Sequence, residues 1–157
     1  MAIKVFQQYR IRRNQEYAAS MKKLTDSKIF AQLKDIMMVS AIIGYNNNRF
    51  VPFAKSAEPV LMQFFKENDY DIIDLISFAY RKEQRILKEE EKYTIFESFA
   101  NGGYPILLSK LGLEDIDNID SFSSDQVRTI QKKYYSLLIS GSFLPEKIEL
   151  SDGDLFI

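Results

Sequence analysis

The sequence of 157 residues contains neither cysteine nor histidine. Without cysteine the chain can form no disulfide and no thiolate zinc site, and it has no thiol nucleophile. Without histidine, Ser-His-Asp and Cys-His catalysis are excluded, and the commonest metal ligand is missing. Any catalysis would have to rest on carboxylate, Lys, Tyr, Ser or Thr side chains. We therefore expect a protein that is not an enzyme and that holds no cofactor or metal ion.

Glycine and proline are also scarce, with six and four residues, which argues against a disordered chain. Hydrophobic residues make up 46% of the sequence, enough for one core at this length. The N-terminal segment lacks the continuous apolar stretch of a signal peptide, and the most apolar run, 36–43, is too short to cross a bilayer. The sequence thus predicts a cytoplasmic protein with no membrane contact.

The net charge of −1 hides a strong asymmetry along the chain. Residues 1–55 hold ten basic and three acidic side chains, whereas residues 56–157 hold eleven basic and nineteen acidic ones. A basic first third can bind phosphate groups, or it can pack against the acidic remainder of the same chain. Both interpretations stay open at this point.

The apolar periodicity predicts an all-α or mainly α fold, a compact single domain of six or seven helices with short loops, preceded by a short extended segment. The clearest helix is expected over residues 28–43, where Ile29, Leu33, Ile36 and Met37 begin a broad apolar stripe typical of a central helix. The other expected helices cover residues 14–24, 72–82, 89–100, 105–111 and 124–140. Residues 60–66 fit either a short helix or a strand.

Local signals predict where these helices begin and end. Gly44 and the pair Gly102-Gly103 are expected to end helices, and Thr25-Asp26-Ser27 to cap the next one. Ser123 and Gln126 have the spacing of a capping box, which opens the last helix.

The chain is divided into a helical domain, 1–144, that begins with a basic arm, 1–13, and an acidic C-terminal tail, 145–157. The tail ends in apolar residues, which would dock either onto a partner protein or onto the core of this chain.

Three short patterns resemble catalytic or metal-binding motifs. Ser20 and Lys23 have the S-x-x-K spacing of some acyl enzymes, but the companion motifs are missing. The Glu90-Glu91-Lys92 stretch resembles a nuclease triplet, yet it lies where a helix is expected to begin and where acidic residues favour the helix dipole. The acidic segment 114–120 fails the EF-hand pattern, and a solvated loop is expected there.

Three further stretches carry a family resemblance. They are Arg10-Ile11-Arg12-Arg13, then Ile42-Ile43-Gly44-Tyr45 with Arg49, and finally Phe96-Glu97-Ser98-Phe99-Ala100-Asn101-Gly102-Gly103. Together they resemble the small proteins associated with the Dnd system, the bacterial DNA phosphorothioation machinery. The resemblance covers residues 10–111, and its most specific part is the Phe96–Gly103 stretch. It implies a role beside DNA sulfur modification or the restriction that reads it, in phage defence, and it assigns no reaction.

The leading hypothesis is a non-enzymatic accessory protein of a Dnd modification-restriction system that binds other Dnd proteins, with DNA as a second candidate partner. The expected contact residues are Arg10, Arg12, Arg13, Tyr45 and Arg49, since these matched positions are least explained by packing. The alternatives are a small metal-dependent nuclease built on carboxylates and a structural module that forms homo-oligomers.

Overall fold

The computed structural model describes residues 3–141 of the chain. Its five α-helices and two short strands confirm the mainly α fold. In chain order they are β1 (Arg10–Ile11), α1 (Ala18–Asp26), α2 (Leu33–Asn46), β2 (Val60–Leu61), α3 (Glu67–Arg81), α4 (Glu91–Lys110) and α5 (Ser124–Ser140). Four short 3-10 helices lie between them, at Gln15–Tyr17, Met62–Phe64, Gln84–Lys88 and Ile116–Asn118.

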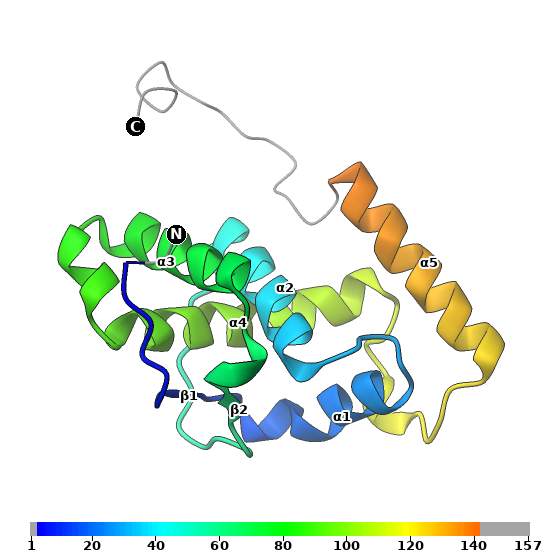
Figure 1. Ribbon diagram of the computed structural model, residues 1–157. Helices are drawn as coiled ribbons and strands as arrows, with labels where there is room; N and C mark the ends of the chain where they lie inside the picture. The colour runs from blue at the N-terminus through cyan, green and yellow to red at the C-terminus, as the bar shows by residue number, and fades with distance from the viewer. Residues whose placement is uncertain (1–2, 142–157) are drawn as a thin grey trace.

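The centre of the fold is the pair α2 and α4, which lie against each other and are covered by the remaining elements (Figure 1). Both helices are apolar over most of their surface. Ile36, Met37 and Ile43 of α2, and Phe96 and Leu107 of α4, are almost completely buried. Such all-round burial confirms the central position that the broad apolar stripe of α2 predicted.

The N-terminal arm runs alongside α4 in the same direction (Figure 1). The backbone N–H of Phe6 donates to the Tyr93 hydroxyl, at 3.0 Å, near the start of α4. Further along, β1 pairs antiparallel with β2, with Ile11 opposite Val60. The extended segment expected near the N-terminus is therefore present, and it is fixed by contacts along its length.

Helix α5 lies at the side of the molecule (Figure 1). It packs through the ring of Tyr134, whose centroid is 5.0 Å from that of Phe30, and the Gln131 side chain donates to the Lys28 carbonyl. Ile130 is the one residue of α5 that is buried. Most of this helix therefore remains at the surface.

The five α-helices of residues 3–141 are fewer than the six or seven expected, because residues 89–100 and 105–111 do not form separate helices. Helix α4 continues through Gly102, Gly103 and Pro105. Glycine costs about 1 kcal/mol in a helix relative to alanine, and proline more. Here that cost is outweighed by close packing on α2. Gly44 likewise lies inside α2, and Asn48 takes the left-handed conformation expected of Gly44, with φ of 55°.

Three other helix starts were predicted wrongly. Helix α1 begins at Ala18 rather than Asn14, because Gln15–Tyr17 form a 3-10 helix. Helix α2 begins at Leu33 rather than Lys28, because Lys28 adopts a positive φ of 68° and turns the chain. Thr25 and Asp26 consequently belong to α1 and do not cap a new helix. Helix α3 begins at Glu67 rather than Ile72.

Two further local predictions agree with the structure. The Ser123 and Gln126 capping box opens α5, and Gly141 ends it with φ of 72°. Residues 60–66 contain both the strand and a short helix that were the two alternatives. The acidic tail, 145–157, and the domain boundary at residue 144 lie outside the described residues. No helix in the described part of the chain is both long and apolar enough to cross a membrane.

Candidate functional site

The Phe96–Gly103 stretch brings α4 and α2 into backbone contact. A Cβ atom at Gly103 would overlap the Ser40 carbonyl oxygen of α2, and one at Gly44 would overlap the Phe99 carbonyl oxygen of α4. The two helices approach each other so closely that only glycine fits at both positions. The glycines of the second and third resembling stretches thus meet at one helix crossing.

The same part of α4 holds the loop that follows α2. Gly102 leaves room for the backbone of Arg49, where a Cβ atom would overlap the Arg49 carbonyl oxygen. The Val51 N–H donates to the Ser98 carbonyl, at 3.1 Å, and the Asn101 amide donates to the Val51 carbonyl, at 2.8 Å. The loop therefore has a fixed path over α4.

Helix α4 also holds the N-terminal arm, through the buried Glu97. Its carboxylate accepts hydrogen bonds from the Arg12 backbone N–H, at 2.5 Å, and from the Tyr9 hydroxyl, at 3.1 Å. The Asn14 amide donates to the side-chain oxygen of Asn101, at 3.0 Å. Burial raises the pKa of Glu97 to about 7, although the two hydrogen bonds lower it. Its neutral and ionised forms are therefore both populated near neutral pH.

The arm and the loop are also joined to each other. The Gln15 N–H donates to the Lys55 carbonyl and the Ala57 N–H to the Arg13 carbonyl, both at 3.0 Å. The three stretches that carried the resemblance are therefore one structural unit, in which 10–13 and 44–57 rest on 96–103. We call this unit the clamp.

Two of the five expected contact residues are exposed on the clamp, namely Arg10 and Arg49. Arg12 is half-buried. Its guanidinium lies over the ring of Phe53, 5.1 Å from the centroid, and donates to the Ala54 carbonyl at 3.4 Å. These contacts fix the orientation of Arg12 while leaving part of it at the surface.

The other two expected contact residues are held within the fold. Arg13 is 9% exposed, and its Nε atom donates to the Glu58 carbonyl at 3.0 Å. Burial lowers the pKa of Arg13, and the nearby Glu58 raises it. Tyr45 is half-buried and packs edge-on against Phe99, with centroids 5.5 Å apart. The five residues therefore do not form one continuous surface.

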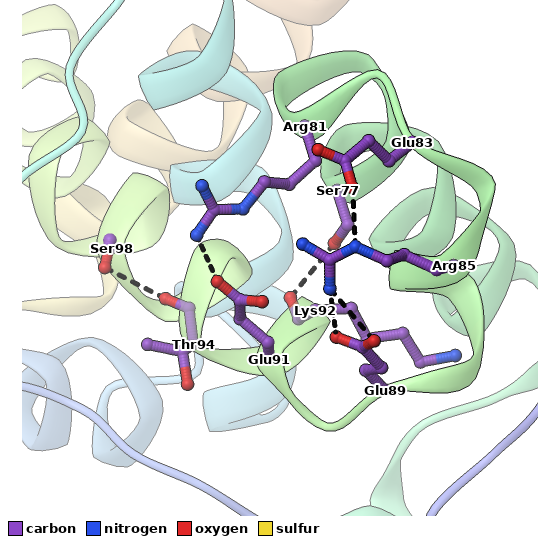
Figure 2. Close-up of polar contacts among 9 residues, drawn as sticks. All are labelled: Ser77, Arg81, Glu83, Arg85, Glu89, Glu91, Lys92, Thr94 and Ser98. Carbon is purple, nitrogen blue, oxygen red and sulfur yellow. Dashed lines mark hydrogen bonds and ion pairs between the residues drawn. The ribbon is translucent and has the colours of Figure 1, made fainter.

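A second polar cluster, which the sequence did not reveal, joins α3 to the start of α4 (Figure 2). Lys92 is almost completely buried, and its Nζ atom pairs with Asp74 at 2.8 Å and donates to the carbonyls of Leu87 and Lys4. The Ser77 hydroxyl donates to the Lys92 carbonyl at 3.0 Å. Lys92 of the nuclease-like triplet thus has a structural role. The position of Lys92 just before apolar residues of a helix was the only sign in the sequence that it forms a buried ion pair.

Exposed arginines surround this second cluster (Figure 2). Arg85 pairs with Glu83 at 2.5 Å and with Glu89 at 2.9 Å, and Arg81 pairs with Glu91. Pairs as exposed as these contribute little to stability. They orient the 3-10 helix Gln84–Lys88 and neutralise Arg85 within it and Arg81 at the end of α3.

The other motif-like patterns also have structural partners. The Ser20 hydroxyl lies 2.7 Å from the Tyr104 hydroxyl, whereas the Lys23 ammonium donates to the carbonyls of Ile116 and Asp117. Within residues 3–141, no three His, Cys, Asp or Glu side chains are grouped so as to hold a metal ion.

One family model matches this chain, over residues 10–133, and its description is DNA sulphur modification system-associated protein 4. The match confirms the resemblance and extends it from residue 111 into α5. No curated protein and no solved structure matches the chain.

Proposed function

Because this chain belongs to the family of DNA sulphur modification system-associated protein 4, we propose that it is a non-enzymatic accessory protein of that system and acts by binding. Its partners are other proteins of the DNA phosphorothioation machinery and the DNA backbone itself. The absence of cysteine and histidine from the sequence supports a role without catalysis.

The observation that carries this proposal is the clamp. A rigid part of α4 holds two distant segments side by side, and each of them presents an exposed arginine, Arg10 from the arm and Arg49 from the loop. The fixed guanidinium of Arg12 belongs to the same unit. Guanidinium groups form paired hydrogen bonds with phosphate oxygens, and a rigid scaffold lowers the entropic cost of binding.

The first test is a fluorescence anisotropy titration of the full chain against labelled duplex DNA, with and without phosphorothioate linkages, at about 50 and about 200 mM salt. Two to three phosphate contacts predict an affinity that falls by roughly 10- to 40-fold over this range. A preference for the sulfur-bearing duplex would assign a reading role to the clamp.

The variants for this test are Arg10→Glu and Arg49→Glu, because both side chains are exposed and neither donates a side-chain hydrogen bond within residues 3–141. Arg12 and Arg13 are unsuitable, since reversing their charge would also disturb the arm. Arg128→Glu on α5 is the matched control, because Arg128 is exposed and lies in another part of the chain. We expect weaker binding from the two clamp variants and unchanged binding from the control.

Equal losses in all three variants would mean that DNA responds to the overall charge and not to the clamp. If the unchanged chain fails to bind DNA even at low salt, the DNA part of the proposal is refuted. The same variants are then tested in binding assays with the purified proteins of the system. Retention of every interaction by both clamp variants would refute the proposed surface.

A further inference from the structure

Arg13 lies at the wall of a cavity of about 510 Å³ between the N-terminal arm, the start of α2 and β2. Successive side chains of an extended segment point to opposite sides. Arg13 therefore shares the inward side of Ile11, whereas Arg10 and Arg12 lie on the other side. The cavity is thus distinct from the exposed arginines of the clamp.

The state of Arg13 calls for an explanation. Its side chain is buried, and its Nη1 atom has no hydrogen-bond partner among residues 3–141. Leaving a charged donor buried and unsatisfied costs more free energy than leaving a neutral donor in that state. Arg13 also forms no ion pair with another side chain of residues 3–141. A ligand with a negatively charged oxygen would supply the missing partner.

The rest of the cavity has little free charge. The other cation on its wall, Lys34, is already paired with Asp69 at 2.7 Å and with Asp35 at 3.3 Å. Glu58, at the rim, is negative and exposed. Arg13 is therefore the one cation of the wall that has no ion pair within residues 3–141. With Glu58 nearby, such a wall fits a single negative charge better than the closely spaced phosphates of a nucleic acid.

Most of the wall is apolar. Leu33, Pro59, Val60, Leu61 and Phe64 line the cavity, and Phe64 is 47% exposed. Gln32, the N-cap residue of α2, lies on the same wall, and within the described residues its side chain makes no capping hydrogen bond. The positive end of this helix therefore faces the cavity as well. The chemistry is that of an anionic group attached to an apolar body.

We propose that this cavity binds a peptide segment of a partner protein that carries one acidic side chain next to a large apolar side chain. The carboxylate pairs with the Arg13 guanidinium, and the apolar side chain packs between Leu61 and Phe64. Since Nη1 is covered, binding includes a rotation of Phe64 or Glu58, two of the exposed side chains of the wall. The inference deepens the proposed function, because it gives the chain a site for protein partners that is separate from the exposed arginines of the clamp.

The test is a titration of the full ¹⁵N-labelled chain with the blocked peptide acetyl-Gly-Glu-Leu-Leu-Gly-amide, followed by heteronuclear NMR. We expect saturable shifts of the Leu61 and Phe64 amide signals and of the Arg13 Nε–H signal. Replacing Glu by Gln in the peptide removes the charge-assisted hydrogen bonds, and we expect binding about ten times weaker or worse.

The variant for this test is Phe64→Ala, which removes an exposed side chain that the core does not need. It should weaken binding of the peptide, whereas the matched control Leu75→Ala, at a 67% exposed position of α3, should not. Arg13→Gln should abolish the preference for the acidic peptide while retaining a donor to the Glu58 carbonyl.

Absence of saturable shifts at millimolar peptide overturns the proposal, and so does equal binding of the Glu and Gln peptides. A DNA duplex that shifts the Arg13 signal where the peptide does not would assign the cavity to nucleic acid instead. Arg10→Glu and Arg49→Glu separate the two proposals, because they should leave peptide binding unchanged whether or not the clamp binds DNA.

Discussion

Replacing Gly103 with alanine tests the helix crossing on which the clamp depends. The new Cβ atom would overlap the Ser40 carbonyl oxygen and lie 2.5 Å from the Gly44 amide nitrogen. Both atoms belong to the backbone of α2 and cannot rotate away, so the two helices must separate. Overpacking of this kind destabilises a protein by about 3 kcal/mol, whereas the better helix propensity of alanine stabilises it by about 1 kcal/mol. We expect the free energy of unfolding to fall by about 2 kcal/mol.

Urea denaturation followed by circular dichroism measures this change, and for a chain of this size it corresponds to a melting temperature lower by roughly 4–8 °C. Ser109→Ala is the matched control, because Ser109 is an exposed residue of the same helix. Because alanine has a better helix propensity than serine, the Ser109→Ala protein should be as stable as the original chain or up to about 0.5 kcal/mol more stable. A Gly103→Ala protein as stable as the control would refute the close crossing of α2 and α4.

Three further predictions concern the buried and exposed charges. The pKa of Glu97 is raised to about 7 in the fold, so its neutral form stabilises the protein at low pH, and this contribution is lost as pH rises from about 4.5 through 7. The resulting decline in the free energy of unfolding is worth up to about 3 kcal/mol. Glu97→Gln should abolish this decline in urea titrations at pH 5 and 8. Lys92→Met should cost about 3 kcal/mol because it leaves Asp74 buried without its cation, and adding Asp74→Leu should restore part of the loss in the same assay. Arg81→Ala should cost less than about 1 kcal/mol in thermal melts, because its ion pair is partly exposed; a loss as large as that of Lys92→Met would contradict the assigned burial.

Local signals predicted the elements that local interactions determine. The Ser123 and Gln126 side chains form their capping box within a single turn, so α5 was predicted correctly at both ends. The broad apolar stripe of α2 likewise predicted its central position. In both cases neighbouring residues contain the required information.

The glycines were predicted wrongly because their role depends on a distant helix. A rule based on propensity ends a helix at Gly102-Gly103, whereas the structure uses these residues inside α4, where they contact Arg49 and Ser40. Leu75 and Leu138 are exposed for a related reason, since no other element of residues 3–141 covers that part of either helix.

The candidate site was only partly accessible from the sequence. The three resembling stretches contained its components, but not the contacts that join them through Glu97 and Asn101. Arg10, Arg12 and Arg13 were treated as equivalent, although the alternation of an extended segment places Arg13 on the side of Ile11. The buried Ile11 was the signal that separates Arg13 from its neighbours.

The hydrogen bond between Glu97 and residue 12 has a consequence for substitution at that position. Glu97 is bound by the main-chain N–H of Arg12, which every amino acid except proline supplies. This hydrogen bond therefore places little constraint on which side chain residue 12 carries, and the constraint that remains comes from the contacts of Arg12 with Phe53 and Ala54. A chain with another residue at position 12, proline excepted, would keep this main-chain support while losing the side-chain contacts of Arg12.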